Sequence, residues 1–228
     1  MYKKINCPIF VLFLSFSLSA QNQYYLSSST GNDNNNGSQT QPWKTLSKIS
    51  NTTLGPGDTV YFKKGDTFRG HYVVNGSGTK GNPITFTSYG SGNQPIIRGS
   101  NHNDGGGDYR EAILVTNHDN MVFDDLEIQN HRTIPRTGVG DLVSFGIRVE
   151  VSDSNVDLNN FFFRNMTFKN VYGLYWVDPS NQSEFNAFEV SGLTFKSSWG
   201  GTINDVVVED SYFTRQRNIG VWQIHPLF

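Results

Sequence analysis

The chain has 228 residues, of which 36% are hydrophobic and 14% aromatic, so it can form one core of ordinary size and is not a disordered chain. Its formal net charge of −2 excludes a nucleic-acid binder that depends on a basic field over the whole protein. The 23 glycines and only 17% charged residues indicate a turn-rich chain and disfavour helical bundles and coiled coils.

Residues 1–20 have the order of a secretory signal, with Lys3 and Lys4 before an apolar run and small residues up to Ala20. We therefore expect a secreted protein, extracellular or periplasmic, with one mature domain over 21–228. The apolar run is short for a permanent membrane helix, so an uncleaved anchor is the alternative and no other membrane contact is expected. Cys7, the single cysteine, lies in this segment, which excludes disulfides and cysteine catalysis in the mature chain.

The N-terminal part of the mature chain has less regular patterns. Trp43, Leu46 and Ile49 recur at helical spacing within 42–49, which predicts a short amphipathic helix covering the N-terminal end of the fold. Alternating apolar residues bounded by glycine-rich loops then predict four short strands, at 59–62, 72–74, 84–86 and 96–98.

Four later segments repeat one eight-residue pattern, in which two short strands flank a bend. They start at Met121, Phe161, Phe188 and Val206. The bend column contains Asp125, Asn165, Gly192 and Asp210, which are residue types that tolerate a left-handed backbone. The apolar positions of the pattern are expected to point inward and to stack from one copy to the next.

A third strand, starting with glycine, completes each unit of the repeat. Its copies are 146–149, 173–176, 200–203 and 220–223, with a weaker copy at 112–115. Three short strands per unit, without intervening helices, predict an all-β fold in the form of a parallel β-helix with three-strand coils. An antiparallel sandwich fits less well, because it gives no reason for a fixed three-strand unit.

Three segments of the N-terminal half resemble a known family: YYLSSSTGNDNNNGSQTQPWKTLSKI, GPGDTVYFKKGDTFRG and GNPITFTSYGSGNQPIIRG. The chain resembles secreted right-handed β-helix proteins of the pectate-lyase-like superfamily. The resemblance implies a right-handed coil with a carbohydrate polymer along its outside, against the Gly-led strand. Because the superfamily includes lyases, glycosidases and adhesins, it does not choose an activity. Relatives have more coils, so we expect a chain that is incomplete at its C-terminus.

Outward residues of the Gly-led strand are the candidate ligand contacts. Alternation leaves Arg148 and Glu150 outward, and Tyr175 and Trp222 are aligned with Arg148. Aromatic rings stack on sugars, and a guanidinium binds a uronate carboxylate through two hydrogen bonds. Ordinary solvated side chains are the alternative interpretation.

Basic residues of the loops that enter this strand, Lys169 and Arg215 among them, predict a local basic strip that favours an anionic polysaccharide. In a lyase, one of these two side chains would remove the proton beside the uronate.

Asp178, Asp205 and His225 are the candidate catalytic residues. The repeat aligns them at the same strand end in successive coils, about 4.8 Å apart. Two carboxylates at that spacing approach the separation of about 5 Å in retaining glycosidases, or bind Ca²⁺ together. Ordinary turn chemistry is the alternative for both aspartates. No metal-loop spacing occurs, so no metal or cofactor is indicated and Ca²⁺ stays open.

The sequence therefore predicts a monomeric, secreted lyase or glycoside hydrolase acting on an acidic or plant- or algal-type extracellular polysaccharide, with no nucleic-acid partner. Two alternatives stay open. The first is a non-catalytic carbohydrate-binding or adhesion β-helix, and the second is an inactive fragment of a larger enzyme.

Overall fold

The computed structural model describes residues 21–100, 107–132, 143–172, 189–197, 200–216 and 221–224, and only the backbone of 215–216 and 221–224. The segment 1–20, where the secretory signal is predicted, lies outside this range. The fold is all-β with one short helix, and every pairing between the named strands is parallel. The predicted all-β class with parallel strands is confirmed.

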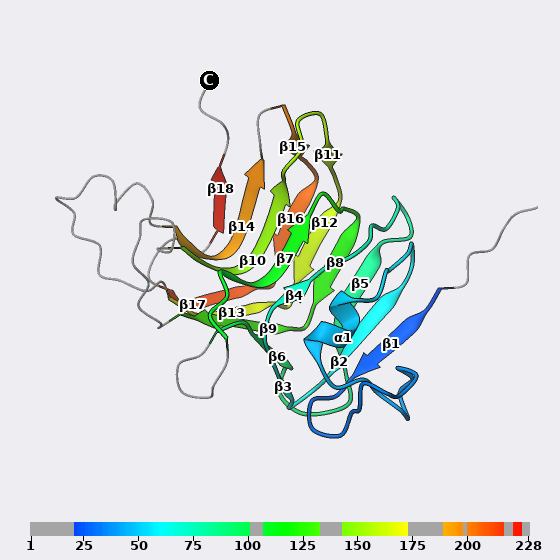
Figure 1. Ribbon diagram of the computed structural model, residues 1–228. Helices are drawn as coiled ribbons and strands as arrows, with labels where there is room; N and C mark the ends of the chain where they lie inside the picture. The colour runs from blue at the N-terminus through cyan, green and yellow to red at the C-terminus, as the bar shows by residue number, and fades with distance from the viewer. Residues whose placement is uncertain are drawn as a thin grey trace, which may run out of the picture.

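Three sheets organise the strands (Figure 1). Sheet I consists of β1 (Gln23–Leu26), β2 (Thr59–Lys63), β5 (Ile84–Tyr89), β8 (Met121–Asp124), β12 (Phe161–Arg164) and β16 (Val206–Glu209). Sheet II consists of β3 (Thr67–Arg69), β6 (Ile96–Arg98), β9 (Glu127–His131), β13 (Thr167–Tyr172) and β17 (Tyr212–Gln216).

Sheet III consists of β4 (Tyr72–Val73), β7 (Glu111–Thr116), β10 (Ser144–Val151), β14 (Val190–Ser197) and β18 (Val221–Ile224). A small sheet pairs β11 (Asp157–Leu158) with β15 (Thr202–Ile203). From β2 onward the chain visits sheets I, II and III in turn, and each strand pairs with the equivalent strand of the next coil. Side chains of successive coils therefore lie above one another in register.

The core consists of stacked side chains, as the repeat predicts. Phe123 stacks on Phe163 with ring centroids 5.1 Å apart, and Phe86 extends that stack at 4.7 Å. In the next column Phe168 stacks on Phe213 at 4.6 Å. Burying each of these rings is worth roughly 1.5–3 kcal/mol, so the stacked columns are the main stabilising feature of the coils.

The bend column is confirmed at three of its four positions. Asp125, Asn165 and Asp210 all have left-handed backbones, with φ of 58°, 53° and 47°. They separate the strands of sheet I from those of sheet II. Side chains that can bond a neighbouring peptide tolerate this conformation better than others do, which explains their recurrence.

The predicted copy that starts at Phe188, the third along the chain, is wrong. Residues 190–197 form one continuous strand of sheet III, β14, instead of two strands around a bend at Gly192. The register places Gly192 beside Gly146, where a Cβ on Gly146 would lie 2.3 Å from the Gly192 carbonyl oxygen. Glycine is needed here because two coils approach closely, and not because the backbone bends, as the repeat predicts.

The Gly-led strands at 112–115 and 146–149 are confirmed as parts of β7 and β10 in sheet III, and residues 221–223 of the copy at 220–223 lie in β18 of the same sheet. Gly220 lies outside the described residues. The copy at 200–203 is wrong, since Thr202 and Ile203 pair with β11 in the small sheet. The copy at 173–176 lies outside the described residues.

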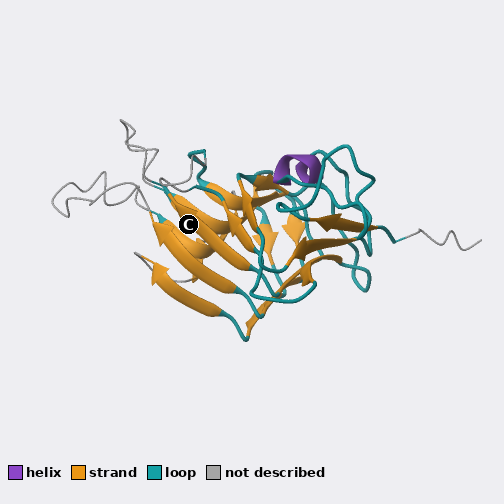
Figure 2. Ribbon diagram, turned by 90° about the horizontal axis from the view of Figure 1, so that it is seen from below, coloured by secondary structure: helices purple, strands orange, loops and turns teal. Residues whose placement is uncertain are grey.

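The predicted N-terminal helix is present but shorter: α1 spans Leu46–Ser50. Trp43 lies before it, in a parallel bridge with Leu26, and the side chains of Leu46 and Ile49 are buried. Figure 2 shows α1 against the strands at the N-terminal end, where the Val73 N–H donates to Ser50 Oγ over 3.1 Å. Across the described ranges, no helix has the length and hydropathy needed to cross a membrane.

Candidate functional site

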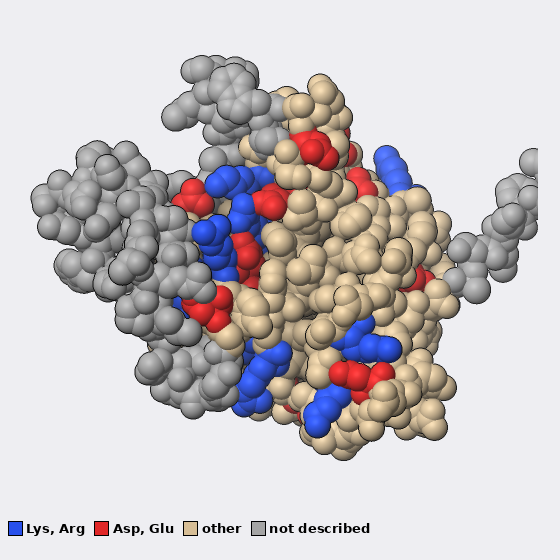
Figure 3. Space-filling model, in the orientation of Figure 1, with Lys and Arg blue, Asp and Glu red and all other residues tan. Residues whose placement is uncertain are grey.

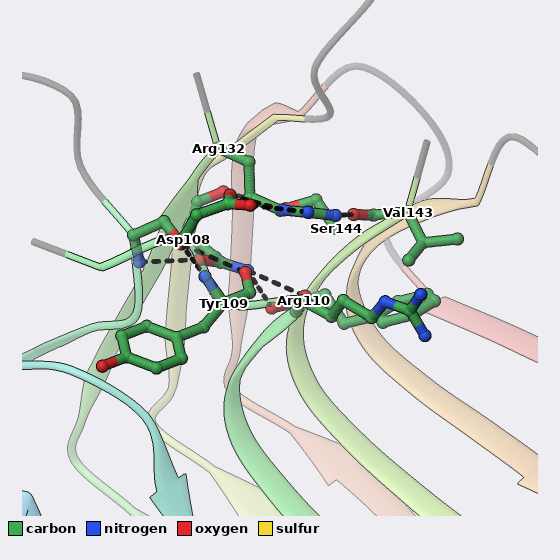
Figure 4. Close-up of polar contacts among 9 residues, drawn as sticks. Asp108, Tyr109, Arg110, Arg132, Val143 and Ser144 are labelled. Carbon is green, nitrogen blue, oxygen red and sulfur yellow. Dashed lines mark hydrogen bonds and ion pairs between the residues drawn. The ribbon is translucent and has the colours of Figure 1, made fainter. Parts of the chain in front are cut away.

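A buried ion pair holds the chain where it enters sheet III (Figure 4). The Arg132 guanidinium donates from Nε and Nη2 to the two carboxylate oxygens of Asp108, over 2.8 and 2.9 Å. Nη1 donates to the carbonyl of Val143. Only 1% of the Arg132 side chain and 4% of the Asp108 side chain are exposed. The pair thus connects the residues before β7, after β9 and before β10.

Asn130, which is fully buried, fixes the same entry points through hydrogen bonds of its side chain. Its amide Nδ2 donates to the carbonyl oxygens of Tyr109, Arg110 and Phe145, over 2.9–3.1 Å. Its Oδ1 accepts from the Ser100 N–H over 2.8 Å. Because buried backbone groups must be paired, one side chain here satisfies groups of successive coils. The sequence analysis missed Asn130, and no local pattern distinguishes it from other asparagines.

A charged triad lies on the outer face of sheet III, beside these entry points. Arg148 Nη1 donates to Glu111 Oε1 over 2.7 Å, and Nη2 donates to Glu150 Oε2. The Arg148 guanidinium also lies over the Phe145 ring, 5.5 Å from its centroid. Thr116 Oγ1 donates to the other oxygen of Glu150 over 3.1 Å. Side-chain exposures of 18% for Arg148, 8% for Glu111 and 19% for Glu150 make this a largely buried cluster.

The front surface in Figure 3 shows basic and acidic side chains interspersed over sheet III, with neither sign dominant. His71 borders this region, with its ring 5.5 Å from that of Tyr109. Burial lowers the pKa of His71, against the opposing charge of Glu111, so the imidazole is neutral at neutral pH. Among the described residues, His71 Nε2 and Arg148 Nε have no hydrogen-bond partner.

The predicted ligand contacts are only partly brought together. Arg148 and Glu150 both lie in the triad. Thr194 is the register partner of Arg148 on one side and of Trp222 on the other, so the predicted alignment of Trp222 with Arg148 is confirmed for the backbone. Lys169 and Arg215 lie instead on strands of sheet II. Tyr175 lies outside the described residues.

The predicted basic strip does not form as one surface. Arg132, which the sequence places in a basic loop, is buried against Asp108, and Lys196 lies 3.9 Å from a Glu189 oxygen. Arg132 is thus neutralised by a carboxylate of the preceding coil, whereas Lys196 lies near a carboxylate that directly precedes its own strand, β14.

The predicted alignment of the catalytic candidates is wrong for Asp205. This residue is exposed and precedes β16 of sheet I, with a left-handed φ of 54°. It continues a column with Asn120 and Asn160, whose side chains bond to each other over 2.8 Å. The error follows from the wrong assignment of 200–203, which placed Asp205 at the end of a Gly-led strand. Asp178 and His225 lie outside the described residues.

Metal binding has no support in the part of the chain that the structure describes, where no three His, Cys, Asp or Glu side chains gather as ligands. Ca²⁺ binding stays a prediction.

Comparison with known proteins gives a sequence relative and structural neighbours. No known protein-family profile matches the chain. The chain is 36% identical to a lacto-N-biosidase of Bifidobacterium longum subsp. longum in an alignment of 205 residues, which covers 68% of this chain and 12% of that protein.

One structural neighbour is the GH136 lacto-N-biosidase from Eubacterium ramulus. Its selenomethionine crystal structure matches with a TM-score of 0.68 at 22% identity, over 86% of this chain and 35% of that one. The native crystal structure matches with a TM-score of 0.61 at 21% identity, over 84% and 36%. These values show a shared fold. The chain thus spans about an eighth of the sequence relative and about a third of the solved one.

Proposed function

We propose that this chain forms a right-handed parallel β-helix in a secreted glycoside hydrolase, and that a glycan lies along the outer face of sheet III. The 36% identity to a lacto-N-biosidase carries the proposal. The right-handed coil is favoured because parallel crossover connections are right-handed in nearly all proteins. Secretion is proposed from the signal-like order of residues 1–20.

The outer face of sheet III offers the chemistry that a sugar needs. Carboxylates such as Glu111 accept hydrogen bonds from hydroxyl groups. Trp222 belongs to the register column of Arg148, and we propose that its ring packs on the apolar face of a sugar. From the name of the relatives we propose a lacto-N-bioside as the sugar unit. Asp178 and His225 stay candidate catalytic residues, whereas Asp205 is better explained as a bend residue.

The test is an assay of the purified mature chain, residues 21–228, with an aryl lacto-N-bioside and a panel of uncharged and uronate-rich glycans. Release of the aryl group and new reducing ends are the expected result. Asp178→Asn should lower that rate by at least about 100-fold if it acts as acid or base. Asp124→Asn, on sheet I, is the matched control and should leave the rate unchanged.

Two outcomes would contradict the hydrolase. Unsaturated, ultraviolet-absorbing products from the uronate glycans would identify a lyase instead. Absence of any product across the panel would remove both enzyme activities.

A binding-only protein is the second candidate, because the chain spans only 12% and 35% of the two lacto-N-biosidases. It predicts retention on immobilised glycan without any product, and weaker retention of Trp222→Ala. Loss of retention in that variant together with measurable hydrolysis by the wild type would favour the enzyme.

A further inference from the structure

We propose that Glu111 and Glu150 set the sugar specificity of the outer face of sheet III, by neutralising Arg148 so that this face takes uncharged sugars and rejects uronates. This inference rests on the proposed function, because it assumes that a glycan lies on this face. It reverses the role expected for Arg148 from the sequence, which was to bind a uronate carboxylate.

The first step concerns the donors of Arg148. Both terminal nitrogens of the guanidinium already donate to carboxylates, one of Glu111 and one of Glu150. A uronate carboxylate that binds arginine through two hydrogen bonds needs two neighbouring nitrogens of the guanidinium, and the third nitrogen of Arg148, Nε, is buried. A uronate would therefore have to displace a glutamate that the strand register holds in place.

The second step concerns net charge. One guanidinium and two carboxylates give the triad a charge of −1, and the neighbouring His71 adds no positive charge because its pKa is lowered by burial. Lys196, the register neighbour of Glu150, is itself close to Glu189. The three triad side chains are at most 19% exposed, so water screens the repulsion of an incoming carboxylate less than at an open surface.

The third step concerns what the triad can still bind. The Glu111 carboxylate has two acceptor oxygens, of which Oε1 accepts from Arg148. A carboxylate held in this way is a fixed acceptor for sugar hydroxyl groups, which are donors without charge. The arrangement thus favours an uncharged ring over an acidic one by both attraction and repulsion.

The experiment measures dissociation constants by calorimetry at low salt, with an aryl lacto-N-bioside and with trigalacturonate. The wild type should bind the lacto-N-bioside at least tenfold more tightly. The double variant Glu111→Gln with Glu150→Gln leaves Arg148 uncompensated. It should bind trigalacturonate at least tenfold more tightly than the wild type does and bind the lacto-N-bioside more weakly.

Three further variants separate charge from structure. Arg148→Gln changes the charge in the opposite direction and should weaken trigalacturonate binding further. Asp124→Asn frees Arg164 on the outer face of sheet I and should leave both constants unchanged. Arg110→Gln tests the exposed cation beside Glu111 in the chain and should not reproduce the effect of the double variant. If the double variant does not fold, Glu150→Gln alone should give the same direction.

An unchanged ratio of the two constants in the folded glutamate variants would overturn the inference, as would a wild type that prefers trigalacturonate. If the wild type still cleaves or binds the lacto-N-bioside in that case, the proposed function stands and only the specificity assignment is lost. If the wild type binds neither sugar, the proposed function and this inference both fail.

Discussion

The outer faces of sheets I and III each carry an arginine paired with a carboxylate of the adjacent strand, but the two arginines differ in burial. On sheet I, Arg164 and Asp124 are register partners of adjacent strands, 3.3 Å apart, and 49% of the Arg164 side chain is exposed. On sheet III, Arg148 reaches a glutamate of the adjacent strand and one of its own strand, and is 18% exposed. Burial, and not the identity of the charges, distinguishes the two faces.

The comparison shows how a regular coil creates a special surface. The register brings charges of neighbouring coils together on sheets I and III, and most exposed pairs of this kind contribute little. On sheet III the entering segments are fixed by Arg132 and Asn130, and the charges beside them lose contact with water. A surface with fixed and partly dehydrated charges can discriminate among ligands, whereas the open pair on sheet I cannot.

The largest expected effect is on the buried pair at the entry to sheet III. Arg132→Met leaves the Asp108 carboxylate buried without its partner, so the free energy of unfolding should fall by about 3–5 kcal/mol. Urea denaturation followed by circular dichroism measures this loss. A loss below 1 kcal/mol would mean that this pair is no more important than one on sheet I.

The next effect tests the close approach of coils in sheet III. Gly146→Ala would place a Cβ 2.3 Å from the Gly192 carbonyl oxygen, and should cost about 1–3 kcal/mol through overpacking. Gly55→Ala is the matched control, since the nearest atom to its added Cβ is 3.9 Å away. Equal melting temperatures of the two variants would contradict the close packing of β10 on β14.

A small effect is expected for the open pair on sheet I. Arg164→Met should change the free energy of unfolding by no more than about 1 kcal/mol, because water screens the pair with Asp124. The same denaturation assay applies, with 0.5 M salt as the control condition. A loss as large as that of Arg132→Met would remove the distinction between the two faces.

The smallest effect is a pH dependence at the bend beside sheet I. Burial alone would raise the pKa of Asp125, but hydrogen bonds from Lys64, Ser88 and Gln94 and the charge of Lys64 outweigh it and hold the pKa below 3.8. The unfolded chain therefore binds this proton more readily. The stabilisation is complete above the unfolded pKa of about 4 and is lost as the pH falls through the folded value.

Asp125→Asn keeps the left-handed bend, which asparagine tolerates, and removes the titration. The stability of the wild type should therefore fall more steeply below about pH 4 than that of the variant. Urea midpoints between pH 7 and pH 3 measure the two slopes. Lys64→Met should also make the loss of stability below pH 4 less steep than in the wild type, because the lysine no longer lowers the pKa of Asp125. Identical slopes in all three proteins would contradict a role of Asp125 in this pH dependence.

The repeat could be predicted where its pattern is local. Alternation identified the apolar columns of Phe123 and Phe168, and the preference of Asp and Asn for left-handed backbone identified the bends at Asp125 and Asn165. The same pattern failed at Gly192 and at 200–203. A glycine that allows a turn and a glycine that allows close packing look alike in a sequence.

The sequence by itself therefore determined the repeat, the inward columns and the parallel all-β class, because each rests on an eight-residue pattern that recurs along the chain. Only the tertiary structure decided which charges meet. Arg148 is 37 residues from Glu111, and Arg132 is 24 residues from Asp108. Loops of unequal length set which residues share a register, so a one-dimensional pattern could not separate a buried ion pair from a solvated charge.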